Sequence, residues 1–230
     1  MKKKGKFIVI DGSDGSGKAT QVALLMKRLE KEGHTVKMVD FPEYYKNFFG
    51  GFIGECLADP KYQWLHMHPK IASVLYAADR FESKGKIEEW LAKGYIVVAN
   101  RYVSANQIHQ GGKIKSAAGR KEFLTWLDTM EHGVFKIPRP NVVVYLDLPT
   151  AVTQKLMISR NKEQNRQYLK KKKDVHEAND DFLKNSRNAA LWLSEELPYF
   201  KKIECAPKGT ILSREEIHAM VYDKVKKIVK

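Results

Sequence analysis

Residues 10–21, IDGSDGSGKATQ, combine residue types and a spacing that suit phosphate binding. Gly12, Gly17 and Lys18 follow the pattern G-x-x-x-x-G-K. Glycines at these positions let backbone N–H groups converge on phosphate oxygens, and the lysine adds a positive charge. The next residue in the pattern is usually a Ser or Thr whose hydroxyl reaches a magnesium ion, but here it is Ala19. The loop therefore predicts phosphate binding and leaves open how a metal is held.

The segments on either side of the loop are the ones that such a loop requires. Residues 6–12, KFIVIDG, are a short apolar run that predicts a strand ending in glycine. Residues 19–34 predict a helix with Val22, Leu25 and Leu29 on one face. A chance glycine turn is the alternative, but the position between strand and helix favours a phosphate site.

The rest of the chain repeats this alternation of strand and helix. Residues 69–93, 182–197 and the C-terminal segment predict helices, and four further apolar runs predict strands. Strands that alternate with helices form a parallel sheet covered on both faces, and ligands bind beyond the carboxyl ends of its strands. Polar residues fall at those predicted ends: Asp11, Asp40, Asn100, Arg101 and Asp147.

Composition limits the class of protein. The 230 residues suffice for a single domain, which we expect to span 1–230, and no apolar run reaches the ~20 residues that cross a membrane. Cys56 and Cys205 lack metal-type spacing, so a reducing cytoplasm is expected. The net charge is +14, but the lysines are spread along the chain. We interpret them as a solvated surface and expect no nucleic-acid partner.

Five segments in order resemble the thymidylate kinase family: DGSDGSGKATQ (11–21), DFP (40–42), YAADR (76–80), NRYVSANQIHQGG (100–112) and VYLDLP (144–149). The resemblance implies an α/β architecture: a P-loop three-layer α/β/α fold with a five-stranded parallel sheet and a mobile lid. It implies a kinase that transfers the γ-phosphoryl group of ATP to dTMP with Mg2+. It also implies a homodimer.

The resemblance assigns ATP to the glycine loop, with Lys18 as a catalytic cation. In related monophosphate kinases the residue after the lysine is not always hydroxylated, which implies a magnesium ion held mostly by phosphate oxygens and water. Asp11 and Asp147 are candidates for its water shell, and the alternative is that they cap strand ends. The implied ATP-binding residues are Gly12, Ser13, Gly15, Ser16, Gly17, Lys18, Ala19 and Thr20.

The resemblance also implies an acceptor site. Arg80 would bond the thymine carbonyl, Tyr76 and Phe41 would line or stack on the base, and Asn106 would contact it. Asp14 would accept from the sugar 3′-hydroxyl, and Arg101 would clamp the acceptor phosphate. His109 would line the pocket, with a structural histidine as the alternative. For Tyr76 and Arg80 the alternative is a core tyrosine and a surface ion pair with Glu82 or Asp79.

Two residues depart from the family pattern. Asn100 stands where the family usually has Asp before Arg-Tyr, so one negative charge near the phosphates is missing. Gly15 stands where some members have arginine, which implies that a lid supplies the transition-state cation. The candidate lid is the cation-rich segment 159–177, with Arg160 and Arg166 favoured as catalytic and Lys162 as a further candidate.

Two other functions remain open from the sequence. One is a kinase for another nucleotide or deoxynucleoside, because a single methyl group separates dTMP from dUMP and gives only ~1–3 kcal/mol of discrimination. The other is a catalytically impaired P-loop regulator, for which Ala19 and Asn100 would mark lost activity.

Overall fold

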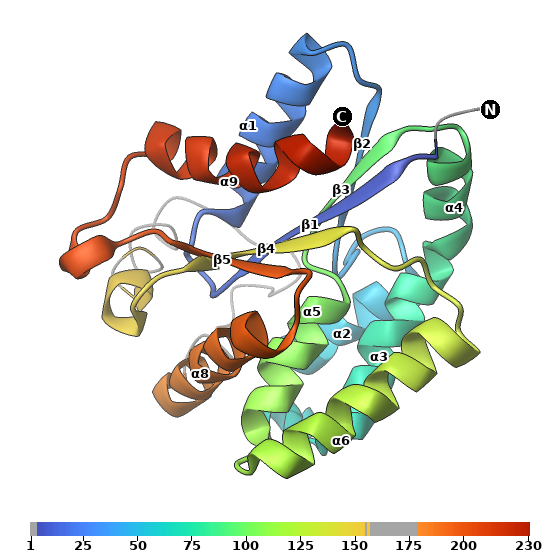
Figure 1. Cartoon of the computed structure of the whole chain (residues 1–230). Coiled ribbons are helices and arrows are strands. Elements are labelled where there is room, and N and C mark those ends of the chain that lie inside the picture. The colour runs from blue at the N-terminus through green and yellow to red at the C-terminus, as the bar shows by residue number, and fades with distance from the viewer. Residues whose placement is uncertain (1–3, 155, 157–178) are drawn as a thin grey trace.

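A five-stranded, all-parallel sheet with strand order β2-β3-β1-β4-β5 forms the centre of the protein, as predicted. The computed structural model describes residues 4–154, 156 and 179–230 (Figure 1). The strands are β1 (Lys6–Gly12), β2 (Val36–Asp40), β3 (Ile96–Asn100), β4 (Val142–Asp147) and β5 (Phe200–Glu204).

Helices cover both faces of this sheet. The longer ones are α1 (Lys18–Lys31), α2 (Phe48–Ala58), α3 (Pro69–Glu82), α4 (Lys84–Ala92), α6 (Ala117–Asp128), α8 (Asp180–Glu196) and α9 (Arg214–Val229), and α5 (Val103–Ala105) is a single turn. Helices α1 and α9 lie on one side of the sheet, while α5, α6 and α8 lie on the other (Figure 1). No helix of the described residues is both long and apolar enough to cross a membrane.

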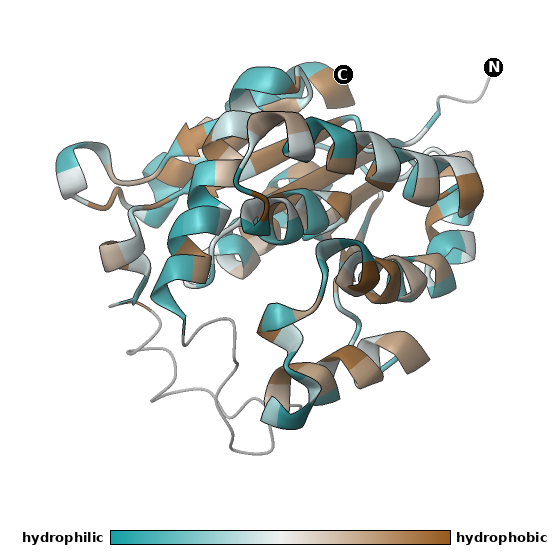
Figure 2. Cartoon of the chain, turned by 90° about the horizontal axis from the view of Figure 1, so that it is seen from below, coloured by the Kyte–Doolittle hydropathy of each residue, from teal (hydrophilic) through white to brown (hydrophobic). Residues whose placement is uncertain are grey.

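The strand residues alternate between two cores, because successive side chains point to opposite faces of a sheet. Ile8 and Ile10 pack with α1 and α9, while Phe7 and Val9 pack with side chains of α4, α6 and α8. The strands form the hydrophobic centre of the molecule in Figure 2. This burial fixes the register, so the carboxyl ends of β1, β2 and β3 lie side by side: Ile10 pairs with Asn100, and Asn100 with Asp40.

The helical region predicted over 69–93 is divided at Ser83 into α3 and α4. The Ser83 side chain is buried and accepts a hydrogen bond from the Asn47 amide at 3.0 Å. Helices α2 and α6 were not predicted. Helix α2 packs on α3 around a third apolar cluster that includes Ile53, Leu57 and Trp64.

Candidate functional site

The glycine loop joins β1 to α1 with the geometry that its sequence predicts. Gly17 has φ 84°, in the left-handed region that favours glycine, and α1 starts directly after it. A Cβ atom on Gly12 would lie 2.5 Å from the Ser16 Oγ and 2.9 Å from the Leu146 carbonyl oxygen. Both glycines are therefore required by the backbone, and the N-terminus of α1 faces the loop.

Lys18 lies over this loop rather than extending into solvent. Its Nζ donates to the carbonyl oxygens of Gly12 and Ser13, each at 2.9 Å, and lies 3.7 Å from an Asp14 carboxylate oxygen. The hydroxyls of Ser13 and Ser16 are buried, and neither has a hydrogen-bond partner among the described residues. Buried polar groups are normally paired, so these hydroxyls indicate a polar ligand such as phosphate.

The polar residues predicted at the strand ends do gather there. The Asp11 carboxylate accepts from the backbone N–H of Gly12 at 2.8 Å and from the Ser104 hydroxyl at 2.5 Å. Asp40 accepts from the Asn100 amide at 2.8 Å. Burial raises the pKa of Asp40, and the nearby positive charge of Arg101 opposes that shift.

Asp147 has a partner that the sequence did not suggest. Its two carboxylate oxygens accept from Arg187 of α8 at 2.7 and 3.1 Å. This bidentate pair joins the end of β4 to α8. Because Arg187 lies far along the chain in an otherwise ordinary amphipathic helix, no local pattern marks it.

The side chains at the strand ends suit a magnesium ion that keeps most of its water ligands better than one that is coordinated mainly by protein side chains. No group of three His, Cys, Asp or Glu side chains within the described ranges is placed to hold a metal. The carboxylates of Asp11 and Asp147, which already accept from Ser104 and Arg187, lie at these ends. A buried Asn100 Oδ1 with no hydrogen-bond partner in the described structure lies there too. Magnesium keeps several waters and binds through phosphates with few protein ligands, so this arrangement is compatible with it.

Arg101 begins the acceptor side of the site. It follows β3 with φ 61°, an uncommon conformation for a residue with a side chain, and its N–H donates to the Ile10 carbonyl at 3.0 Å. Strained backbone of this kind is concentrated at functional sites. The guanidinium pairs with Asp14, so the loop and the end of β3 are joined by a charged contact.

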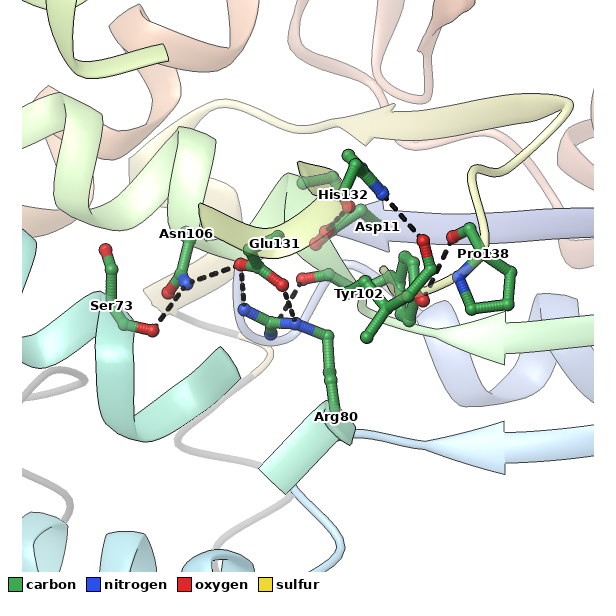
Figure 3. A network of polar contacts seen from close by, with 10 residues as sticks. Asp11, Ser73, Arg80, Tyr102, Asn106, Glu131, His132 and Pro138 are labelled. Atoms are coloured by element: carbon green, nitrogen blue, oxygen red, sulfur yellow. Dashed lines mark hydrogen bonds and ion pairs between the residues drawn. The ribbon is translucent and has the colours of Figure 1, made fainter. Parts of the chain in front are cut away.

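The Arg80 side chain is buried and is bonded to other residues than Arg101 is (Figure 3). It is only 2% exposed, donates from Nε to Glu131 Oε2 at 2.8 Å and from Nη1 to the Tyr102 carbonyl at 3.2 Å. Its Nη2 pairs with the other oxygen of Glu131. The alternative of a surface ion pair with Glu82 or Asp79 is therefore wrong.

Asn106 belongs to the same network. Its Nδ2 donates to the Ser73 carbonyl at 3.2 Å and to Glu131 Oε1 at 3.1 Å. Asn106 and Glu131 lie on π-helical segments, Asn106–Gln110 and Thr129–Val134, and such segments are frequent at functional sites. Sequence reasoning missed Glu131, because a lone glutamate after a helix carries no motif.

The aromatic candidates are packed against other rings. The Tyr76 hydroxyl accepts from Trp64 Nε1 at 3.1 Å, and their ring centroids lie 5.8 Å apart. Phe41 is 2% exposed and lies 5.7 Å from the Tyr102 ring. Their contact with a base stays a prediction.

His109 is held by α8. Its Nδ1 lies 3.1 Å from the Ser186 hydroxyl, and its ring stacks on Phe182 at 5.7 Å. Burial lowers the pKa of His109 to about 4, against the opposing effect of Asp14 and Asp11, so the ring is neutral near pH 7. The candidate lid cations Arg160, Lys162 and Arg166 lie outside the described residues.

Comparisons with known proteins show which family the chain resembles. A family model described as thymidylate kinase matches residues 10–199. A thymidylate kinase of Caldicellulosiruptor saccharolyticus is 29% identical over 229 residues, which are 98% of this chain and 96% of that protein. A probable thymidylate kinase of Pyrobaculum aerophilum is 27% identical over 74% of this chain and 79% of that protein. The solved structure of thymidylate kinase from Candida albicans shares the fold, with a TM-score of 0.72 and 18% identity over 98% of this chain and 92% of that one.

Proposed function

The chain belongs to the thymidylate kinase family, and from this membership we propose that it transfers the γ-phosphoryl group of ATP to dTMP. The observation that carries the proposal is the joining of two half-sites at the carboxyl ends of β1 and β3. The glycine loop with Lys18 forms one half, and Arg101, paired to Asp14 of that loop, begins the other. A donor and an acceptor phosphate bound on these halves would lie next to each other.

On the ATP side, the backbone of residues 12–20 and the positive end of α1 bind the phosphates. Lys18 leaves the Gly12 and Ser13 carbonyls to stabilise charge on the outer phosphates. The buried hydroxyls of Ser13 and Ser16 and the side chain of Thr20 donate to phosphate oxygens. Phosphoryl transfer depends mainly on such positioning and on positive charge around the moving group.

On the acceptor side, Arg101 holds the dTMP phosphate with the planar fork of its guanidinium. Binding of that phosphate releases Asp14 from Arg101, and the Asp14 carboxylate then accepts from the sugar 3′-hydroxyl. The acceptor phosphate oxygen then attacks the γ-phosphorus in line. No general base is needed, because a phosphate monoester is largely ionised near pH 7.

Mg2+ would be held by phosphate oxygens and water, with Asp11, Asp147 and the Asn100 amide oxygen as partners of those waters. When bound, the ion neutralises the charge of the phosphate oxygens. We propose that Arg160 and Arg166 of the lid supply further positive charge in the transition state.

The base lies against Arg80 and Asn106, with Tyr76, Phe41 and His109 on the walls of its pocket. Arg80 donates to the thymine carbonyl. The neutral state of His109 at pH 7 suits an apolar wall, since an unpaired charged ring there would be costly.

We also propose a homodimer and a cytoplasmic location. Four exposed apolar side chains lie on α2 and α3: Phe48, Ile71, Val74 and Phe81. Phe48 is 79% exposed, which favours burial of this surface against a second copy of the chain. Cys56 and Cys205 are buried free thiols, as expected in a reducing compartment.

The test is ADP formation from ATP and Mg2+, with dTMP, dUMP, dCMP, AMP and thymidine offered separately. We expect turnover with dTMP well above that with the other acceptors. Strong turnover with another acceptor would replace dTMP in the proposal. ATP binding without acceptor-dependent turnover would instead favour a regulator.

A further inference from the structure

Glu131 is a fully buried carboxylate that the steps above do not use. It lies on the π-helical segment that follows α6 and is 0% exposed. Its two oxygens accept from Arg80 Nε, Arg80 Nη2 and Asn106 Nδ2. These three bonds come from two candidate base-binding residues, so Glu131 fixes the orientation of both the Arg80 guanidinium and the Asn106 amide.

The first effect is on the guanidinium. Two parallel bonds to one carboxylate fix the plane of Arg80, and the bond from Nη1 to the Tyr102 carbonyl limits it further. Arginine has five N–H groups, and these three bonds occupy three of them. The two others, one on each terminal nitrogen, are oriented by the same contacts. Arg80 can only donate, and these contacts fix the direction of the N–H groups that remain.

The second effect is on the amide. Both contacts of Asn106 Nδ2 are with groups that only accept: the Ser73 carbonyl and the Glu131 carboxylate (Figure 3). An amide turned the other way would place its oxygen against two oxygens. The nitrogen is therefore held by these partners, and Oδ1 is the atom left to face a ligand. Asn106 is thereby fixed as an acceptor.

We propose that Glu131 is a positioning residue that sets the hydrogen-bond polarity of the base pocket, a donor from Arg80 beside an acceptor from Asn106. This inference rests on the proposed function. Thymine and uracil present a carbonyl O4 and an N3–H, which match a donor and an acceptor. Cytosine presents an amino group and a bare N3, which mismatch both. Glu131 therefore selects keto pyrimidines over cytosine without touching either base.

Glu131→Gln tests this directly. A glutamine side chain has one accepting and one donating end. Arg80 bonds both oxygens of Glu131, so it faces a donor in either orientation of the amide, and Asn106 faces one as well when the amide nitrogen takes the place of Oε1. We expect KM for dTMP to rise by about tenfold or more, with kcat and KM for ATP within about twofold, because a binding contact away from the reacting atoms is lost. We expect the dTMP-to-dCMP ratio of kcat/KM to fall by about tenfold or more.

Asp128→Asn is the matched control. Asp128 lies at the end of α6 and forms a bidentate pair with Arg139 at 2.5 and 2.8 Å, but both side chains are exposed. The same chemical change there should leave both KM values and the acceptor ratio unaltered. Glu131→Asp is the second variant, in case the Glu131→Gln protein does not fold. It keeps the charge near Arg80 but withdraws the carboxylate from Asn106, so the acceptor ratio should still fall.

Calorimetric titration with dTMP and with dCMP accompanies the kinetics, because binding does not depend on turnover. A folded Glu131 variant with the wild-type KM for dTMP and the wild-type dTMP-to-dCMP ratio would overturn the role of Glu131 but leave the proposed function standing. An equal loss of kcat/KM with dTMP and with dCMP would do the same. A wild-type protein that binds dCMP better than dTMP would overturn the proposed acceptor and the polarity together. A wild-type protein that prefers dTMP, with a reduced ratio in the variants, would support both.

Discussion

The two ends of the site differ in how their polar groups are satisfied. At the phosphate end, the hydroxyls of Ser13 and Ser16 and the Asn100 amide oxygen are buried without a hydrogen-bond partner among the described residues. At the base end, Arg80, Asn106 and Glu131 are bonded to one another, and the buried hydroxyl of Ser73 is the group there without a partner in the described structure. Under the proposed function, phosphate would supply the missing partners when it binds, whereas the base would meet a pocket that is already oriented.

Lys18→Met breaks the phosphate end and should have the largest effect. The substitution removes the cation held over the loop by the Gly12 and Ser13 carbonyls. We expect kcat to fall by about 10³-fold, as for loss of a preorganised transition-state donor. Lys27→Met, on the exposed part of α1, is the control and should retain wild-type turnover. A decrease below about tenfold for Lys18→Met would show that the loop lysine is not central to catalysis.

The second prediction contrasts the free energies of unfolding of the two ends. Glu131→Ala leaves Arg80 charged and buried without its partner, which should cost about 3–5 kcal/mol. Ser16→Ala removes a hydroxyl that has no partner in the described structure, so it should change stability by less than about 0.5 kcal/mol. Urea denaturation of the ligand-free proteins measures both.

The double variant Arg80→Met with Glu131→Met is the control for this contrast. Replacing both charges with apolar groups removes the unpaired charge, so most of the lost stability should return. If Ser16→Ala were as destabilising as Glu131→Ala, the loop hydroxyl would have a structural role and the contrast between the two ends would fail.

The third prediction concerns His109, which packs against α8 and is influenced by the charges of the phosphate end. Its pKa falls from 6.5 to about 4 on folding, because the ring is buried. The unfolded chain therefore binds the proton more readily, and the stabilisation is complete above about pH 6.5 and is lost as the pH falls towards 4. At about 1.4 kcal/mol per pKa unit, this loss is up to about 3 kcal/mol.

Denaturation at pH 7 and at pH 4.5 measures this effect. His109→Gln should lose less stability than the wild type over that interval, whereas the same change at the exposed His66 should leave the pH dependence as it was. Equal pH dependence in all three proteins would show that His109 titrates normally in the folded state.

Much of the phosphate end was predictable because its chemistry is local in the sequence. The strand, the glycine turn and the helix over residues 6–31 are contiguous, and their order determines where Lys18 lies. The five strands were predictable for a related reason, since buried parallel strands are continuous apolar runs. The carboxyl-end cluster of Asp11, Asp40 and Asn100 then follows from topology alone.

The base end was less predictable because its contacts join distant segments. Arg80 and Glu131 are 51 residues apart. The same holds for one pair at the strand ends, where Asp147 and Arg187 are 40 residues apart. Neither partner has a neighbour that marks it, and charged side chains after a helix are most often solvated. Helix α2 was missed because its sequence, FFGGFIGECLA, contains three glycines, which disfavour a helix until packing on α3 stabilises it.

The smallest expected effect concerns the residue that departs from the loop pattern. Ala19 lies in the first turn of α1 and is exposed, so Ala19→Thr has room for a hydroxyl near the phosphates. We expect the Mg2+ concentration for half-maximal rate to fall by about threefold, which corresponds to ~0.6 kcal/mol. Ala23→Thr, one turn further along α1, carries the same helix-propensity cost without the hydroxyl at the loop and should leave the magnesium dependence unchanged. An equal response of the two variants would mean that the ion is held entirely by phosphate and water. At the phosphate end, the nucleotide alone would then supply the hydrogen-bond partners that the buried hydroxyls and the Asn100 amide oxygen lack in the described structure.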